Sequence, residues 1–199
     1  MILVSFITFV RDIAKAVFLA GLQLRTRLFY LDRESGSSIH LSARLDVIPR
    51  HPAHVRHRLT LKRKALIERS CTVNTWHGDV TLGAHASVGI GTVVIGPVRI
   101  GEHTLCGQHC LITGESHQYA DPSRPVGEQG FVTEPVVIEE NVWIGANSVI
   151  LPGVRIGRNS VIGAGSVVTK EIPPLCLAAG NPARVIKHYS AEEGAWVAM

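Results

Sequence analysis

The 199-residue chain is poor in aromatic residues (6%) and in charged residues (18%), and it contains only four cysteines. These are Cys71, Cys106, Cys110 and Cys176. They form no C-x-x-C pair and lie far apart, so neither a disulfide framework nor a zinc ribbon is expected, and free thiols in a reducing compartment are the simpler interpretation. With 46% hydrophobic residues, the composition fits neither a disordered tail nor a polytopic membrane protein. The length favours one domain with or without an appendage.

A strong charge of one sign is also lacking. Twenty Lys and Arg residues against sixteen Asp and Glu residues give a net charge of +4. This charge suits an anionic ligand, but it is too weak by itself to indicate a nucleic acid. No nucleic-acid partner is therefore expected.

Residues 1–31 are apolar, yet they contain no uninterrupted run that could span a bilayer, because Arg11, Asp12 and Lys15 break the run. The first charge follows the apolar stretch, which is the wrong order for a secretory signal. At 100° per residue the polar side chains gather on one side, which predicts an amphipathic helix with a broad apolar face. That face would pack on its own domain or on another subunit. Alternatively it would attach the protein, expected in the cytoplasm, to the surface of the cytoplasmic membrane.

The rest of residues 1–63 is expected to be an irregular, basic lead-in that consists of a connection and irregular first strands. Three of its histidines are spaced three residues apart: His51, His54 and His57. This spacing would suit a metal only in a helix, and Pro49 and Pro52 argue against a helix. A solvated basic face is expected instead.

A six-residue repeat begins at residue 82 and is interrupted once. The twelve positions at this spacing are all apolar: Leu82, Val88, Val94, Ile100, Cys106, Ile112, Ile138, Ile144, Ile150, Ile156, Ile162 and Val168. The residue four positions after each is small or β-branched in nearly every case, and the residue directly after it is glycine in seven of the twelve. Six is not a multiple of 3.6, so a helix is excluded. The pattern predicts short strands that turn a corner every six residues and stack in coils.

Three sides of six residues make one coil. The repeat supplies two coils over residues 82–117 and two over 138–173, and residues 64–81 are expected to form a degenerate first coil, about five coils in all. The β-helix would thus occupy residues 64–174, followed by a C-terminal cap and tail over 175–199. Large aliphatic side chains would fill the interior, and glycine would permit backbone angles that a Cβ forbids.

The pattern [LIV]-G-x-x-[STAV]-x resembles the hexapeptide-repeat family, and the resemblance covers residues 70–188. It implies a mainly β chain folded as a left-handed parallel β-helix. It also implies a homotrimer whose active sites lie between neighbouring subunits.

The repeat breaks at residues 117–136, which are expected to loop out of the β-helix. Glu115, Ser116 and His117 lie at the root of this loop. Long loops in compact domains are usually functional or disordered. A histidine side chain titrates near neutral pH, so His117 is a candidate general base. An exposed loop histidine without a role is the alternative that the sequence leaves open.

The segments NVWIG, ILPGVRIG, NSVIGAGSVVTKEIPP and AAGNPARVIKHY resemble the closing coils of the xenobiotic, maltose and galactoside O-acetyltransferase branch of this family. The resemblance implies an acetyl-CoA-dependent O-acetyltransferase that needs no metal, with His117 as general base and direct transfer. A sugar hydroxyl in surface-polysaccharide or glycan synthesis is the implied acceptor. An antibiotic acetyltransferase of the chloramphenicol or streptogramin type and a non-catalytic hexapeptide scaffold remain alternatives.

The same resemblance implies which residues contact acetyl-CoA. Trp143 matches a tryptophan that flanks the thioester, and the backbone N–H of Ala146 matches one that faces the developing oxyanion. The main chain of Ala164 matches a contact to the pantetheine arm. The other residues expected around acetyl-CoA are Gly145, Gly163, Thr169, Lys170, Arg184 and Lys187. Arg184 and Lys187 would meet phosphates; for the three cations, a solvated end cap is the alternative.

The acceptor site departs from the family pattern. Galactoside and maltose enzymes carry an acceptor-binding asparagine upstream of the histidine, where this chain has Ser87. The residues expected to replace it or to act beside the base are Asn74, Trp76, His77, Glu115 and Asp121. An indole face stacks on a pyranose ring, although a core tryptophan fits as well. Either carboxylate could orient His117.

The remaining histidines and cysteines have structural interpretations. His85 and His103 are expected to stack on adjacent coils, with His109 on the neighbouring face. The γ-class carbonic anhydrases are metalloenzymes built on the same repeat, but their paired H-x-x-x-x-H ligands are absent here, so no metal is expected. Cys106 and Cys110 occupy interior positions of the repeat, where a small apolar thiol fits.

Overall fold

The computed structural model describes residues 30–47 and 57–199. The predicted amphipathic helix of residues 1–31 lies outside the described residues except for its last two positions, and so do His51 and His54. Within the described ranges, no helix is long and apolar enough to cross a membrane.

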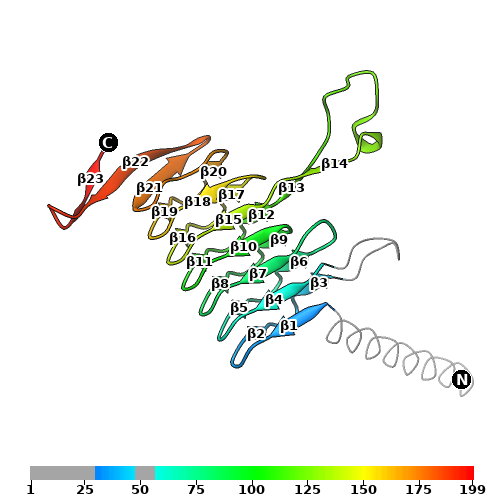
Figure 1. Ribbon diagram of the computed structural model, residues 1–199, viewed down its shortest axis with the longest axis horizontal. Helices are drawn as coiled ribbons and strands as arrows, with labels where there is room; N and C mark the ends of the chain where they lie inside the picture. The colour runs from blue at the N-terminus through cyan, green and yellow to red at the C-terminus, as the bar shows by residue number, and fades with distance from the viewer. Residues whose placement is uncertain (1–29, 48–56) are drawn as a thin grey trace, which may run out of the picture.

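Three parallel sheets form the sides of a triangular coil (Figure 1). Sheet A contains β1 (Leu31–Arg33), β4 (Leu59–Leu61), β7 (Val80–Leu82), β10 (Val98–Ile100), β15 (Val136–Ile138) and β18 (Arg155–Ile156). Sheet B contains β2 (Ser38–Ile39), β5 (Leu66–Ile67), β8 (Ser87–Val88), β11 (Leu105–Cys106), β16 (Trp143–Ile144), β19 (Val161–Ile162), β21 (Cys176–Gly180), β22 (Ala183–Ser190) and β23 (Ala195–Ala198). Sheet C contains β3 (Arg44–Asp46), β6 (Thr72–Asn74), β9 (Val93–Ile95), β12 (Leu111–Thr113), β17 (Val149–Ile150) and β20 (Val167–Val168).

The chain visits sheets A, B and C in turn, so the fold is a parallel β-helix, and its three edges are named AB, BC and CA after the sheets that they join. After β20 the chain returns to sheet A through an isolated bridge between Ile156 and Ile172. Within these three sheets, the last two strands, β22 and β23, run antiparallel to their neighbours, and they extend sheet B over the expected C-terminal cap.

Within the described residues the β-helix has six complete three-strand coils, one more than expected from the sequence. The extra coil is β1 to β3, and the next begins at Leu59, so residues 31–46 belong to the β-helix and not to an irregular lead-in. The cause is in-register pairing of each short strand with the following coil, for example Leu45 with Val73 and Ile39 with Ile67. The prediction that the β-helix starts at residue 64 is therefore wrong.

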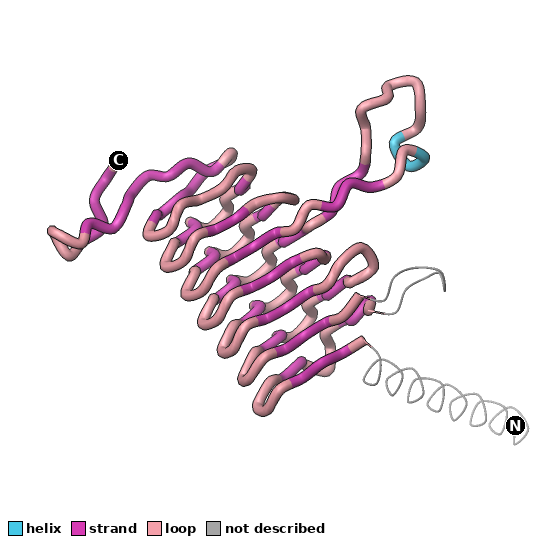
Figure 2. The backbone as a smooth tube through the Cα atoms, in the orientation of Figure 1, coloured by secondary structure: helices cyan, strands magenta, loops and turns pink. Residues whose placement is uncertain are grey.

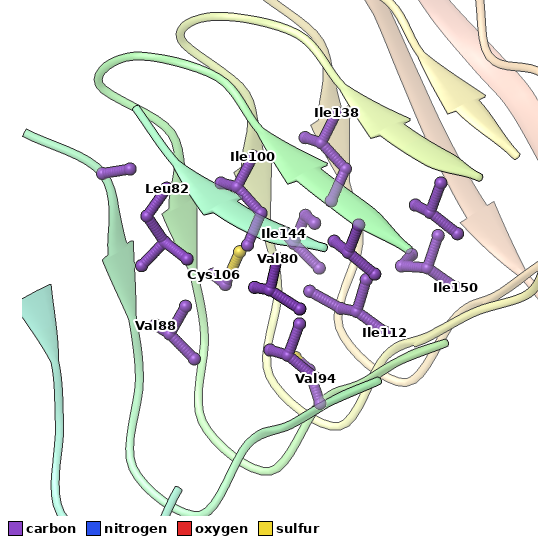
Figure 3. Close-up of a cluster of buried hydrophobic side chains, with 14 of the residues drawn as sticks. Val80, Leu82, Val88, Val94, Ile100, Cys106, Ile112, Ile138, Ile144 and Ile150 are labelled. Atoms are coloured by element: carbon purple, nitrogen blue, oxygen red, sulfur yellow. The ribbon is translucent and has the colours of Figure 1, made fainter. Parts of the chain in front are cut away.

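The interior is filled by the residues of the six-residue repeat (Figure 3). All twelve repeat positions are buried, with exposed fractions of 0–3%. The small or β-branched residues four positions later are buried too, except Ser116, because the chain has left the coil by then. Full burial of one aliphatic side chain contributes about 1.5–3 kcal/mol, so a continuous column of them stabilises every coil against its neighbours. The predicted core is confirmed.

The glycines that follow the repeat positions have a different role from the expected one. None of the seven has a positive φ, so the prediction of unusual backbone angles is wrong. A Cβ on Gly101 would lie 2.3 Å from the backbone carbon of Glu139, and a Cβ on Gly145 would lie 2.5 Å from the backbone nitrogen of Ala164. Glycine is needed at these positions because the backbone of the next coil comes this close.

The positive φ angles occur two residues after each of these glycines. The corner residues there are His85, Gly91, His103, His109, Asn147, Asn159 and Gly165, with φ between 54° and 70°. Glycine, asparagine and histidine tolerate this left-handed conformation better than β-branched residues do. The three histidines are thus corner residues. His85 and His103 stack as expected, with ring centroids 4.7 Å apart and an angle of 7° between the planes.

The part of the chain that the structure describes holds no candidate metal site. No group of three or more histidine, cysteine, aspartate or glutamate side chains is placed there to hold an ion. On the AB edge the column of His85 and His103 continues with Asn141, whose Nδ2 donates a hydrogen bond to Oδ1 of Asn159 at 2.7 Å. The column is therefore a stack of corner side chains along one edge.

All four cysteines are buried free thiols, which leads to a simple chemical prediction. Burial raises the pKa of all four thiols. Because only the thiolate reacts, a raised pKa leaves little reactive form at pH 8. We expect Ellman's reagent to react slowly with the native protein and rapidly with all four thiols in guanidinium chloride. Rapid reaction of a thiol in the native protein would contradict the burial described here.

The segment that leaves the coil between β12 and β15 is a β-hairpin (Figure 2). It leaves after β12 and is built on the antiparallel pair β13 (Glu115–His117) and β14 (Phe131–Thr133), with a single 3-10 turn, η1 (Val126–Glu128), in its loop. The chain therefore departs at Gly114, three residues before the predicted loop of residues 117–136. A Cβ on Gly114 would lie 2.3 Å from the carbonyl oxygen of Pro97, so only glycine fits at this exit.

Candidate active site

The CA edge carries most of the residues with expected catalytic and acceptor roles. They lie at or beyond the ends of strands of sheet C: Asn74 is the last residue of β6, Trp76 and His77 follow it, Glu115 and His117 come after β12, and Thr169 and Lys170, expected near acetyl-CoA, come after β20. Parallel strands of one sheet end at the same edge, so these residues are brought to one side of the coil. The sequence placed them far apart, up to 96 residues from Asn74 to Lys170 by their numbers.

His117 is exposed at the end of β13, directly opposite Phe131 of β14. The two ring centroids lie 4.4 Å apart, and the ring planes are inclined by 38°. Phe131 was not identified from the sequence. The only sequence signal for it is its position in a short run of strand-forming residues, Phe131–Thr133, that follows Gly130 at the end of a polar loop. Its ring holds one side of the imidazole of His117.

Neither expected carboxylate binds His117. The carboxylate of Glu115 instead forms an ion pair with Nδ1 of His77, from the turn after β6, and both side chains are mostly buried. Oδ1 of Asp121 accepts hydrogen bonds from the backbone N–H of Ser123 at 3.0 Å and from its hydroxyl at 2.6 Å. These bonds, the hydroxyl bond first, lower the pKa of Asp121. Asp121 thus holds a turn of its own loop, and the prediction that either carboxylate orients the base directly is wrong in this structure.

Asn74 also has a local role. Its Oδ1 accepts a hydrogen bond of 2.8 Å from the backbone N–H of Trp76, which closes a turn after β6. Asn74, Trp76 and His77 are half-buried at this turn. The side chains expected to contact an acceptor therefore also fix the edge from which the hairpin projects.

A groove runs along the BC edge, and one residue from each of five successive coils lines it at the start of the turn that leaves sheet B. These residues are Glu68, Gly89, Gly107, Gly145 and Gly163, each directly following a buried position of sheet B. Four adjacent coils thus place glycine along the groove, which has a volume of about 580 Å³. This volume lies within the usual range of small-molecule sites, roughly 300–1,000 Å³.

The groove gathers five of the nine residues expected around acetyl-CoA. They are Trp143, Gly145, Ala146, Gly163 and Ala164. Trp143 is 57% exposed and stands in register between Leu105 and Val161 on the outer face of sheet B. Leu105 was not identified from the sequence, although it occupies the outward position of the same hexapeptide as Cys106. The alternation of an exposed Leu105 with a buried Cys106 is the sequence signal from which it could have been predicted.

Arg184 and Lys187 extend this arrangement towards the C-terminus. Lys187 pairs with Leu177, which pairs with Val161, so Lys187 continues the outer row of sheet B that contains Trp143. Arg184 pairs with Ala179, whose Cβ lies 2.9 Å from the position of a Cβ on Gly163. Both cations are exposed. They lie beyond the end of the groove that Gly163 and Ala164 line.

Within one chain the candidate residues therefore form two separate sets. His117, Thr169 and Lys170 lie on the CA edge, whereas the groove lies on the BC edge. Parallel coils of hexapeptides with one extruded hairpin define the class of protein, a parallel β-helix with a glycine-floored groove.

Comparison with known proteins identifies the family. The family model described as "Bacterial transferase hexapeptide (six repeats)" matches residues 135–170. A galactoside O-acetyltransferase of Lactococcus lactis subsp. lactis (strain IL1403) is 43% identical over 103 residues, which make up 52% of this chain and 49% of that protein. A hexapeptide-repeat-containing acetyltransferase from Vibrio cholerae, known from a crystal structure, shares 32% identity with a TM-score of 0.54, over 69% of this chain and 74% of that chain. The chain belongs to the hexapeptide-repeat acyltransferase family.

A more distant protein shares the fold over a larger part of the chain. AntD, an N-acyltransferase from Bacillus cereus solved with dTDP and 3-hydroxybutyryl-CoA, superposes with a TM-score of 0.68 at 18% identity, over 87% of this chain and 90% of that chain. This likeness concerns the fold alone. The chain spans about half the length of the galactoside O-acetyltransferases that it matches.

Proposed function

We propose that the protein is an acetyl-CoA-dependent O-acetyltransferase that acts on a sugar hydroxyl in surface-polysaccharide or glycan synthesis. The proposal depends on one observation: within one chain, His117 lies on the CA edge, whereas the glycine-floored groove lies on the BC edge. Two edges of one triangular coil cannot meet, but the CA edge of one subunit can meet the BC edge of another. A homotrimer of left-handed β-helices, as the family implies, would complete three such sites.

The groove suits the pantetheine arm of acetyl-CoA because it is narrow and its floor lacks side chains. A Cβ on Gly107 would lie 2.7 Å from the backbone nitrogen of Ala146, and one on Gly145 would lie 2.5 Å from that of Ala164. Glycine therefore keeps the main chain of both alanines accessible from the groove. Preorganised backbone N–H groups stabilise charge that appears only during reaction, which is the role proposed for Ala146.

His117 is proposed as the general base of a direct transfer. Its imidazole takes the proton of the acceptor hydroxyl while that oxygen attacks the thioester carbonyl carbon. A carbon–oxygen bond forms and the carbon–sulfur bond breaks. The imidazolium then returns the proton to the departing thiolate, so the products are the acetyl ester and free coenzyme A, with no acyl-enzyme. Such proton transfer contributes about 10²- to 10⁴-fold to the rate.

Release of free thiol from acetyl-CoA tests this proposal. The protein would be assayed with a panel of free sugars, nucleotide sugars, chloramphenicol and a streptogramin, and each product would be examined by mass spectrometry for one added acetyl group. We expect acceptor-dependent release with at least one sugar. Transfer only to an antibiotic would replace the sugar by the alternative acceptor class. Absence of coenzyme A binding by calorimetry would favour a scaffold protein over an enzyme.

Arg184 and Lys187 provide a prediction about the donor. If they meet the phosphates of coenzyme A, Arg184→Gln should raise the KM for acetyl-CoA by about 10-fold, since a hydrogen bond to a charged group contributes about 1.5–3 kcal/mol. Lys187→Gln should act in the same direction, and kcat should remain unchanged. Initial rates at increasing acetyl-CoA would measure this. Arg99→Gln, on an exposed position of sheet A, is the matched control. An equal KM in the wild type and in both variants would contradict the phosphate role.

A further inference from the structure

Three aromatic rings form a short stack at the root of the hairpin. Phe131 lies against His117, with centroids 4.4 Å apart, and also against His77, with centroids 4.6 Å apart. The planes of Phe131 and His77 are inclined by 35°. Phe131 therefore contacts an imidazole from its own hairpin and one from the preceding part of the coil.

A single ion pair connects the same two segments. His77 binds Glu115 through Nδ1, and Glu115 stands two residues before His117 on β13. Side chains two apart on a strand point to the same face, so Glu115 and His117 share one face of the hairpin. Phe131 lies directly opposite His117 on β14 and shares that face too. His77 of the coil thus contacts two side chains of the hairpin, Glu115 and Phe131.

At its root the hairpin is also held by hydrogen bonds to its own main chain: the N–H of Gly153 donates to the carbonyl of Glu134 at 3.0 Å, and Oγ1 of Thr113 donates to the carbonyl of Glu115 at 2.9 Å. Beyond Gly114 its residues are exposed, apart from Glu115 and two loop residues, Asp121 and Gln129, that hydrogen-bond to each other within the loop. A charge-assisted bond between largely buried groups is roughly twice as strong as a neutral one and fixes geometry as well. The contact of His77 with Glu115 and Phe131 is therefore well placed to set the angle at which His117 leaves the coil.

The geometry points to His77 as a positioning residue for His117, acting through Glu115 and Phe131. His77 holds the hairpin against the CA edge through Glu115. The ring of Phe131, which contacts both His77 and His117, then fixes the position of the imidazole of His117. The inference rests on the proposed function, in which His117 is the general base. It gives His77 and Glu115 a role different from the acceptor contact expected from the sequence.

The test compares His77→Ala with His77→Phe in steady-state kinetics. A general base displaced by about 1 Å can lose up to 100-fold in rate. We expect His77→Ala to lower kcat about 10- to 100-fold and to leave the KM for acetyl-CoA within about twofold of the wild type, because the groove lies on another edge. His77→Phe keeps a ring against Phe131 and loses the bond to Glu115, so its kcat should lie between the two. His85→Asn is the matched control, because His85 is also half-buried and stacked on a second ring.

A second readout does not depend on turnover. In protein with ¹³C-labelled histidine, the Cε1–Hε1 resonance of His117, assigned from its loss in His117→Ala, reports the ring of Phe131. We expect this resonance to move towards the position of an exposed histidine in His77→Ala and to stay in place in His85→Asn. An unmoved resonance, an unchanged kcat in His77→Ala, or an equal loss of kcat in His85→Asn would each overturn the inference. If the wild type transfers no acetyl group to any acceptor, the proposed function fails, and the resonance alone decides whether His77 positions His117.

Discussion

Replacement of His117 by alanine is expected to lower kcat for acetyl transfer by about 10²- to 10⁴-fold, the usual contribution of a positioned general base. The side chain is exposed on a hairpin outside the hydrophobic core, so its removal should leave the six coils and the thermal midpoint unchanged. The KM for acetyl-CoA should change little, because the groove contains no part of the hairpin. Thiol release with the best acceptor of the panel, measured at saturating acetyl-CoA, checks the expectation.

The control for this variant is His40→Gln, which removes another exposed imidazole, one that bonds only locally to Ser42 in the first coil. It should retain wild-type kcat. Equal turnover of His117→Ala and the wild type would remove His117 as the base, and no other imidazole on the hairpin could take its place, because His117 is the only histidine between residues 114 and 135.

Replacement of Gly101 by alanine is expected to destabilise the fold by about 1–3 kcal/mol, the usual cost of overpacking a well-packed site. The added Cβ would lie 2.3 Å from the backbone carbon of Glu139 and 2.5 Å from its carbonyl oxygen. Backbone atoms cannot rotate away as a side chain does, so the coils on either side must separate locally. Denaturation in guanidinium chloride at a fixed protein concentration measures the change, since an oligomer's apparent stability depends on concentration.

Gly127→Ala is the matched control, because a Cβ at this loop glycine would meet no atom within 4 Å and its φ is not positive. The same chemical change should therefore leave the midpoint of unfolding where it is. Equal midpoints for Gly101→Ala and the wild type would show that the coils are not packed as closely as described.

The core of the fold was predictable because burial repeats at a fixed spacing. Apart from Cys106 and Arg33, the coils place Leu, Ile or Val at the same three interior positions, so the apolar pattern marks the strands without any long-range information. The extra coil at the N-terminus was missed for a reason visible in its residues. Leu61, Ile67 and Val73 keep the six-residue spacing, but the longer turn before Val80 shifts the register by three residues, and Arg33 replaces an apolar residue in the first coil.

The role of the glycines was not predictable from their position in the repeat alone. A glycine signals either an unusual φ or the close approach of another backbone, and a sequence does not distinguish the two. In this chain both occur two residues apart, with Gly107 at a close approach and His109 at the positive φ. The histidines at such corners therefore look like candidate ligands in the sequence although they serve as turn residues.

The candidate site was predictable in its parts and not in its assembly. The resemblance identified His117 and the residues of the groove, which the structure places on two edges. The partnership of Glu115 with His77 was missed because it joins residues 38 positions apart through a hairpin whose direction no local pattern encodes. Phe131 was missed because a single aromatic residue in a polar loop carries no periodicity.

The glycine floor of the groove also constrains how this fold can diversify. The residues that would have to change to reshape the floor are those that hold consecutive turns of the chain together, so altering the bottom of the channel would loosen the whole stack. New specificities can arise only where the backbone is not under this constraint, along the rim at Leu105 and Trp143 or in the protruding hairpin. If the groove binds the acetyl donor as proposed, a conserved groove combined with a variable hairpin would allow the same fold to accept many different acceptors.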